Sequence, residues 1–292
     1  MKMKNPLILA SGIRGNNHYL LIRAAKQGAG AVTSKSYSIE PRQGHENPTA
    51  FMQGDVMINA MGLPNPGIGE GIKDIKKAVK GAKVPIIASI VGFSVKEFSQ
   101  AAKRISEANP HMIEVDASCP NVGKGNKMFS WSIEDASAVA SAVRSSTTIP
   151  FSMKLSPDVP NIGQIAKACV DSGADCITAV NAMGGMYIDA YAKKGILHNW
   201  FGGTSGPPLK PIALKSVYSI RKAIGPKIPI IGTGGVTTGI DAVEMIMAGA
   251  TAVGVGTALV LRKDAFSGIA KEMESFMKKN KYSQISQLTL DE

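Results

Sequence analysis

The chain has 292 residues, of which 44% are hydrophobic and 19% are charged. This length supports a large hydrophobic core, and α/β barrels often use it as one domain, so we expect a single domain over residues 1–292. The early apolar run, residues 6–10, is far too short for a signal-peptide core or a membrane span. These features predict a cytoplasmic protein without a membrane segment.

The formal net charge of +11 raises the question of a nucleic-acid or acidic partner. The lysines are spread along predicted helix faces, as in Lys73, Lys76, Lys77 and Lys80, and no aromatic residues interleave them as a base-stacking platform would require. A solvated basic surface explains the charge better. We therefore expect no nucleic-acid partner.

The cysteines and histidines do not form a metal-binding or disulfide pattern. Cys119, Cys169 and Cys176 include no C-x-x-C pair and leave an odd count, and the four histidines are scattered. We assign no metal. We expect Cys169 and Cys176 to be inert core residues.

Short apolar runs rich in β-formers alternate with longer segments of helical periodicity, which is typical of a parallel sheet. Eight strands are predicted, at residues 6–10, 31–34, 85–89, 111–115, 150–155, 175–180, 229–233 and 252–255. Helices are predicted near residues 17–27, 68–79, 95–109, 133–144, 161–172, 211–224, 239–248 and 265–278.

Eight strand–helix pairs predict a (β/α)8 TIM barrel, in which functional groups sit where strands end and loops begin. Polar and glycine-rich residues follow all eight strands, which the alternative, a doubly wound sheet, would not explain. Two longer connections, residues 37–66 and 182–210, interrupt the barrel rhythm. Insertions of this length usually carry lids or substrate contacts.

The last two strand ends predict a phosphate site. Gly234 and Gly235 follow one strand, and Gly256 and Thr257 follow the next, so backbone N–H groups there can approach an anion near a helix start. In a barrel, the loops after strands seven and eight commonly bind phosphate. The alternative is that these glycines only make tight turns, but their occurrence in both units favours the phosphate interpretation.

Three strand ends carry reactive or charged side chains. Lys154 and Lys35 each end an apolar strand, where a buried lysine needs an anion or acceptor nearby, unless it reaches solvent. The strand 111–115 runs into a turn in which Cys119 precedes Pro120. This position predicts a reactive cysteine that the turn holds in place. The alternative is a small buried residue, which would give the same pattern.

The sequence resembles the class 1 dihydroorotate dehydrogenases over nearly the whole chain. The combination of Asn-Ala-Met-Gly-Leu-Pro-Asn-Pro-Gly at residues 59–67 with Ser-Cys-Pro-Asn at residues 118–121 is the specific part of the match. Residues 5–12, 34–36 and 40–42 match as well, and residues 203–214 look more like the class 1B branch. The resemblance implies an FMN-containing (β/α)8 enzyme of pyrimidine synthesis that oxidises dihydroorotate to orotate.

The same resemblance implies roles for individual residues. Cys119 would be the base that removes a proton from C5 of dihydroorotate while a hydride passes from C6 to flavin N5. FMN would be held by residues at the strand ends, namely Ser11, Lys35, Ser36, Ser89, Asp116, Lys154, Val180, Gly206, Gly234, Gly235, Gly256 and Thr257. The substrate would be held by Lys35, Asn59, Ala60, Met61, Gly62, Leu63, Asp116, Asn121, Asn181 and Ala182.

Three pocket positions depart from the family pattern. Ser89 and Asp116 stand where the family has Asn, and Ala182 stands where it has Thr or Ser. An ionised Asp116 only accepts hydrogen bonds, and it would oppose both a thiolate at Cys119 and the orotate carboxylate, unless a lysine offsets it. Two alternatives therefore stay open. One is an FMN barrel oxidoreductase for another substrate of the dihydropyrimidine or dihydrouridine type, including dihydrouridine in transfer RNA. The other is a flavin-binding protein without turnover.

The resemblance also implies partners. It suggests a homodimer, which in the class 1B branch pairs with a subunit that carries FAD and an iron–sulfur cluster. The electron acceptor stays open at this point.

Overall fold

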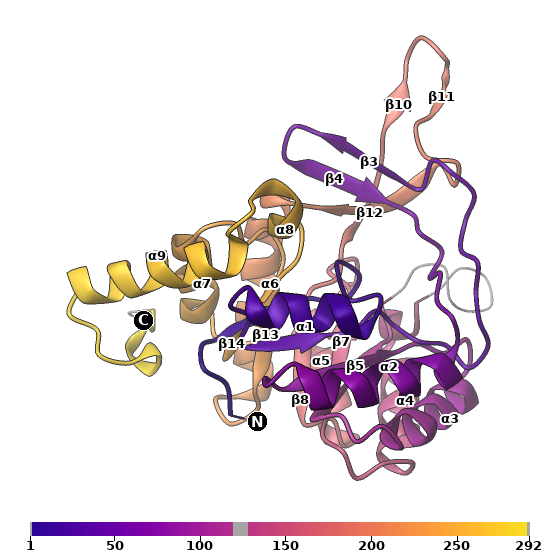
Figure 1. Ribbon diagram of the computed structural model, residues 1–292, viewed down its shortest axis with the longest axis horizontal. Helices are drawn as coiled ribbons and strands as arrows, with labels where there is room; N and C mark the ends of the chain where they lie inside the picture. Colours follow the sequence, from indigo (N-terminus) through magenta and orange to yellow (C-terminus); the bar gives the residue numbers. More distant parts are fainter. Residues whose placement is uncertain (1, 119–127, 291–292) are drawn as a thin grey trace.

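The computed structural model describes residues 2–118 and 128–290 of the chain (Figure 1). Eight parallel strands close into a barrel in the spatial order β1-β14-β13-β8-β7-β6-β5-β2, which confirms the predicted fold and excludes the open, doubly wound sheet. All eight predicted strands are present. They are β1 (Leu7–Leu9), β2 (Ala31–Thr33), β5 (Ile86–Ile90), β6 (Met112–Asp116), β7 (Phe151–Leu155), β8 (Cys176–Ala179), β13 (Ile230–Thr233) and β14 (Ala252–Val255).

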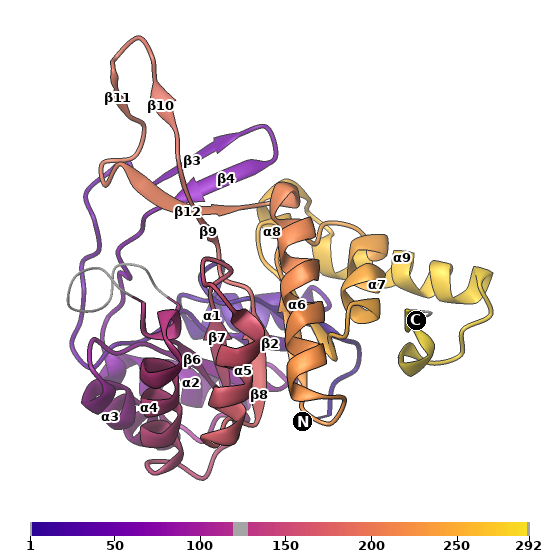
Figure 2. The same cartoon turned by 180° about the vertical axis from the view of Figure 1, so that it is seen from behind.

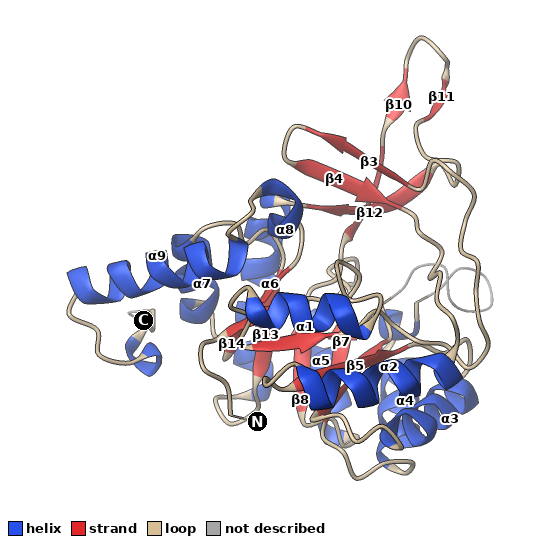
Figure 3. Ribbon diagram, viewed as in Figure 1, coloured by secondary structure: helices blue, strands red, loops and turns tan. Residues whose placement is uncertain are grey.

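The helices surround these strands, as the colouring by secondary structure makes visible (Figure 3). Polar side chains define several helix starts; Asn17, for example, accepts a hydrogen bond from the backbone N–H of Leu20. The short α8 was not predicted, because four residues give no periodicity. The helices are α1 (His18–Lys26), α2 (Ile68–Gly81), α3 (Val95–Ser106), α4 (Ile133–Arg144), α5 (Ile162–Asp171), α6 (Lys210–Ile224), α7 (Gly239–Met247), α8 (Ala258–Leu261) and α9 (Ala265–Lys279).

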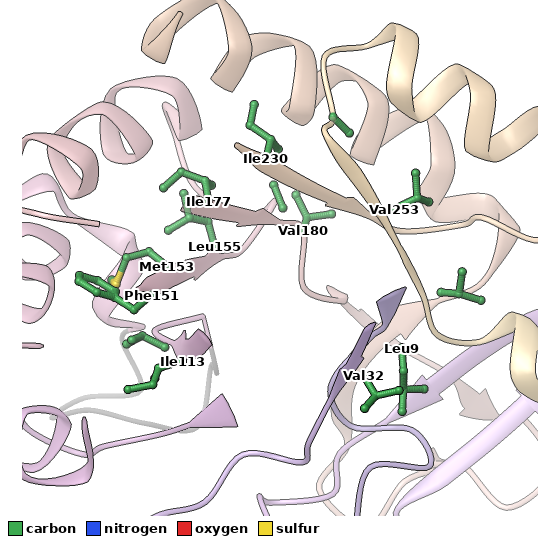
Figure 4. Close-up of a cluster of buried hydrophobic side chains, with 14 of the residues drawn as sticks. Leu9, Val32, Ile113, Phe151, Met153, Leu155, Ile177, Val180, Ile230 and Val253 are labelled. Atoms are coloured by element: carbon green, nitrogen blue, oxygen red, sulfur yellow. The ribbon is translucent and has the colours of Figure 1, made fainter. Parts of the chain in front are cut away.

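The core lies around the barrel strands. Every residue of β7 is buried, because helices cover the strand on the outside and the barrel interior covers it on the inside. Figure 4 shows Phe151, Met153 and Ile177 grouped in this core, contributed by neighbouring strands. Such two-sided burial explains why some barrel strands, such as β1 with Leu-Ile-Leu, are apolar throughout. β7 differs, because Ser152 and Lys154 alternate with its apolar residues.

The two long connections contain strands that the sequence did not reveal. An antiparallel sheet in the order β3-β4-β12-β9 combines strands from both connections, with Asn59 on β4 opposite Gly203 on β12. Figures 1 and 2 show this sheet on one side of the barrel, with the β10–β11 hairpin projecting beyond it. Its strands are β3 (Ala50–Gln53), β4 (Val56–Asn59), β9 (Met183–Met186) and β12 (Phe201–Ser205), and the hairpin pairs β10 (Ile188–Asp189) with β11 (Lys194–Gly195).

In the part of the chain that the structure describes, no helix combines the length and the apolar character that a bilayer crossing requires.

The buried ring of Phe151 provides a test of the core. Phe151→Ala should lower the free energy of unfolding by about 3–5 kcal/mol, because the lost ring leaves a cavity that barrel strands cannot collapse to fill. Denaturant unfolding measures the loss. As a control, Ile240→Ala on the outer side of α7, where the side chain is 46% exposed, should change it by less than about 0.5 kcal/mol. Equal losses in both variants would contradict this placement of the core.

The start of α7 provides a test by pH. Thr238 and Asp241 form a capping box, and the ammonium of Lys210 lies 2.6 Å from the Asp241 carboxylate. Burial alone would raise the pKa of Asp241, but the hydrogen bonds from Lys210 and from the N–H groups of Thr237 and Thr238 lower it to about 2. The stabilisation is therefore complete above the unfolded-state value of 3.8 and is lost as the pH falls toward 2.

We accordingly expect Asp241→Asn to lower stability by about 0.5–2 kcal/mol at neutral pH, with the difference from wild type shrinking between pH 4 and pH 2. Thermal unfolding across this range measures it. Asp171→Asn removes an exposed pair with Lys167 and should cost less than about 1 kcal/mol throughout. A difference for Asp241→Asn that stays constant down to pH 2 would show that its charge contributes nothing.

Candidate active site

A cavity of about 810 Å³ lies where the carboxyl ends of the barrel strands meet the β3-β4-β12-β9 sheet. Barrel residues such as Lys154 and Thr233 form one wall, and sheet residues such as Asn59 and Phe201 form another. The sheet segments that contain Asn59 and Phe201 are more than a hundred residues apart in the chain, and together they cover the mouth of the barrel. This is the face on which barrel enzymes place their active sites.

Nearly all of the residues predicted for cofactor and substrate are brought together in this cavity. Ser89 is the exception among the described ones: it is fully buried behind Ser36, to which its hydroxyl lies at 2.9 Å. Cys119 and Asn121 lie outside the described residues. The lining includes Ser11, Lys35, Ser36, Asn59, Ala60, Met61, Gly62, Leu63, Asp116, Lys154, Val180, Asn181, Ala182, Gly206, Gly234, Gly235, Gly256 and Thr257.

The loops after β13 and β14 form a backbone cradle at one end of the cavity. Gly235 has a φ of +75°, and a Cβ there would meet the backbone nitrogen of Lys210, at the start of α6, at 2.5 Å. Only glycine allows this approach of loop and helix. The Thr257 hydroxyl donates to the Ser205 hydroxyl at 2.9 Å, which ties the β14 loop to β12. Backbone N–H groups and hydroxyls so gathered suit an anion such as phosphate.

Lys154 places a buried positive charge in the cavity wall. Its ammonium donates to the Ser11 hydroxyl at 2.7 Å and lies 3.9 Å from the carboxylate of Glu114 on β6. Lys154 is only 6% exposed, so it does not reach solvent as a surface lysine does. An ammonium carries three N–H donors, so Lys154, which lines the cavity, keeps donors for an acceptor bound there.

Lys35 lies on the same mouth, after β2. Burial lowers the pKa of Lys35, because the ammonium loses hydration. An anionic group bound beside it would oppose that effect and hold the side chain charged.

Hydroxyls and amides surround Asp116 at the end of β6. The Ser118 hydroxyl donates to its carboxylate at 2.8 Å, and the Ser36 hydroxyl lies 3.4 Å from the other carboxylate oxygen. The Asn181 amide donates to the Ser118 hydroxyl at 2.8 Å. Three strand ends are thereby joined through hydrogen bonds beneath the cavity.

Several cavity residues escaped the sequence reasoning. Asp158, in the loop after β7, accepts a hydrogen bond from the backbone N–H of Gly184 on β9 at 2.7 Å and so holds the covering sheet to the barrel. Glu114 does not line the cavity but lies buried in the middle of β6, close to Lys154, and the apolar pattern of that strand gave no sign of it. Phe201 gave no signal, since β12 was not predicted.

The remaining described cysteines lie away from this site. Burial raises the pKa of Cys169 and of Cys176 to about 12, so both thiols stay protonated at neutral pH, in agreement with the expectation that they are inert core residues. Within residues 2–118 and 128–290, no group of three or more His, Cys, Asp or Glu side chains is arranged to hold a metal ion.

The comparisons with known proteins agree with this geometry. The crystal structure of DHODH in complex with ferulenol from Eimeria tenella superposes with a TM-score of 0.84 over 97% of this chain and 84% of that one, at 20% identity, which shows a shared fold. The catalytic subunit of dihydroorotate dehydrogenase B (NAD(+)) from Pyrococcus abyssi is 40% identical over 289 residues, which cover 99% of this chain and 95% of the relative.

The subunit of the same name from Methanocaldococcus jannaschii is 41% identical over 296 residues, with 100% and 94% coverage. A family model described as dihydroorotate dehydrogenase matches residues 1–277. The resemblance seen in the sequence motifs is thus confirmed, and the chain belongs to the dihydroorotate dehydrogenase family.

Proposed function

We propose that this protein is the catalytic subunit of a class 1B dihydroorotate dehydrogenase, which uses FMN to oxidise (S)-dihydroorotate to orotate on the route to UMP. The observation that carries the proposal is the single cavity in which an anion cradle, the buried Lys154 and the amides of Asn59 and Asn181 meet. Family membership and relatives named as catalytic subunits support it.

The residues present fit FMN. Gly234, Gly235 and Gly256 would hold the phosphate through backbone N–H groups, because they carry no side chain that would block an anion, and the backbone N–H of Thr257 would add to them. The ammonium of Lys154 would contact the flavin ring of FMN at the edge where negative charge accumulates when the flavin is reduced. FMN, when bound, supplies the acceptor for a hydride.

The other end of the cavity suits a small, amide-bearing substrate. Asn59, Asn181 and the backbone of residues 60–63 offer both donors and acceptors, as the edge of a dihydropyrimidine requires. Lys35 is the cation we assign to the substrate carboxylate. This pairing would oppose the lowering of the Lys35 pKa by burial.

We assign the base to Cys119 on the strength of the motif at residues 118–121, since the residue lies outside the described part. The thiolate of Cys119 would take the proton from C5 as the hydride leaves C6. Ser118, immediately before it, is tied to Asp116 and Asn181, so the strand end that delivers the cysteine is held in place.

We further propose a homodimer that works with an FAD and iron–sulfur subunit in the cytoplasm. The relatives support the second subunit, because they are named as catalytic subunits of an NAD(+)-dependent enzyme. The homodimer rests on the family resemblance, and the cytoplasmic location rests on the sequence. The alternative with a specific observation behind it is a different dihydropyrimidine substrate. Asp116 adds a buried acceptor-only group to the cavity wall, and Ala182 packs against Gly203 with no hydroxyl to offer.

The cradle can be tested with two glycines. Gly235→Ala should abolish or strongly reduce flavin retention, because its methyl group would collide with the backbone of Lys210. Gly225 is the matched control: its φ of +71° imposes similar strain, but a Cβ there meets nothing within 4 Å. We therefore expect Gly225→Ala to keep its flavin. The ratio of flavin absorbance to protein in the purified variants measures this, and equal retention would argue against a phosphate cradle at Gly235.

The reaction can be tested without knowing the electron acceptor. Dihydroorotate added anaerobically should bleach the flavin band of the wild type, and Cys119→Ala should slow bleaching by about 10²–10⁴-fold, the usual contribution of a general base. Stopped-flow absorbance measures the rate. Bound flavin that dihydroorotate does not bleach would refute the substrate and favour the alternative dihydropyrimidine. Equal rates in both proteins would refute the base.

A further inference from the structure

A short chain of hydrogen bonds links the end of β6 to the residue after β8. The Ser118 hydroxyl donates to Oδ1 of Asp116 at 2.8 Å, and Nδ2 of Asn181 donates to the Ser118 hydroxyl at 2.8 Å. Oδ1 of Asn181 accepts from the backbone N–H of Ala182, also at 2.8 Å. All three distances lie within the normal range for strong hydrogen bonds. Asp116 and Ser118 are both buried, at 6% and 1% exposure.

The direction of this chain follows from its first member. An ionised carboxylate has no proton to donate, so Ser118 must direct its one hydrogen to Asp116. The Ser118 oxygen is then left only as an acceptor, and the Asn181 amide must turn its NH2 group toward it. The backbone N–H of Ala182 favours the same orientation, because it donates to Oδ1 of Asn181. One N–H of Asn181 remains for the cavity, which this residue lines.

We infer that Asp116 is a positioning residue: by fixing the direction of the Asp116–Ser118–Asn181 chain, it makes Asn181 present an N–H donor to the substrate. The cavity therefore selects a substrate that places a hydrogen-bond acceptor, a carbonyl or carboxylate oxygen, against Asn181. The identity of that substrate rests on the proposed function, but the orientation of the amide does not. The same hydrogen bonds explain how the carboxylate of Asp116 is accommodated in the cavity wall, since Ser118 and Ser36 both donate to it.

An asparagine at position 116 would leave the direction open. Its side chain offers both a carbonyl oxygen and an NH2 group, so Ser118 could accept from it and turn its own hydrogen toward Asn181. That hydrogen would oppose the NH2 group of Asn181 and compete with the Ala182 N–H for Oδ1. A leucine at position 116 would remove the acceptor altogether. The two substitutions thus separate loss of direction from loss of the hydrogen bond.

The first test needs no substrate. The side-chain amide of Asn181 is followed by nitrogen-15 NMR in the flavin-loaded protein and assigned by its absence in Asn181→Asp. We expect one slowly exchanging Nδ2 proton in the wild type and at least tenfold faster exchange in Asp116→Leu and in Ser118→Ala. Ser152→Ala is the matched control, since it removes another buried hydroxyl, bonded to Thr178, outside this chain. Unchanged exchange in Ser118→Ala would overturn the inference, even if Asp116→Leu failed to fold.

The second test measures binding of orotate by the change in the flavin spectrum. Asp116→Leu and Ser118→Ala should each weaken binding about tenfold, roughly the loss of one hydrogen bond, and the double variant should be no weaker, because both break the same chain. Asp116→Asn should lie between the wild type and Asp116→Leu. A hundredfold loss in the double variant would mean independent effects and would overturn the inference. If the wild type binds no orotate while the amide responds as expected, the proposed substrate fails and the positioning role stands.

Discussion

Closure of the barrel is the constraint on which the rest of the structure depends. β1 pairs with β14 on one side and with β2 on the other, so Ile8 lies between Gly254 and Ala31. This register joins the start of the chain to its end and forces all eight strands to present their carboxyl ends at one mouth. Ser11 can then accept a hydrogen bond from Lys154, which lies 143 residues further along. An open sheet would not bring these two residues together.

The covering sheet depends on the same closure. β4 and β12 come from different connections, and they can pair only because the barrel returns their ends to the same side. Their pairing roofs the cavity and excludes part of the solvent, which strengthens the electrostatic interactions within it. The bond from Gly184 to Asp158 then holds this roof to the barrel wall. The cavity is therefore a product of tertiary structure, because its two walls have no local connection.

The sequence was sufficient for the barrel, and the reason is physical. Strands such as β1 and β14 are buried on both faces, so each forms a short apolar run that is distinct from the amphipathic helices around it. The strand-end positions of Lys154, Gly235 and Thr257 followed from the order of elements alone. The roles of residues 59–63 came from resemblance to a family, because nothing in their pattern specifies a pyrimidine.

The roof was not predictable in the same way. β9 reads Met-Gly-Gly-Met, which has neither the alternation nor the branched side chains of a strand, and β12 contains two further glycines. These glycines are required by close approach: a Cβ at Gly203 would meet the Cβ of Ala182 at 2.7 Å. Local propensity was overruled by packing between strands that are distant in sequence. Glu114 was missed for a related reason, since a carboxylate inside an apolar strand becomes intelligible only when Lys154 is seen on the neighbouring strand.

The arrangement of charge would allow the proposed FMN phosphate and the proposed substrate ring to share one cavity. The loops after β13 and β14, which we propose hold the phosphate, offer backbone N–H groups, while the buried ammonium of Lys154 is balanced in part by Glu114 at 3.9 Å. The carboxylate of Asp116 is surrounded by hydroxyl and backbone donors, so its charge is spread over hydrogen bonds and it does not neutralise the lysine. Because Glu114 and Asp116 have different partners, Lys154 keeps an N–H donor for an electron-rich acceptor. Lys35 is then the cation for an anion at the opposite end of the cavity. The polarity of the cavity thus depends on the separate partners of Glu114 and Asp116, and not on the net charge of the protein.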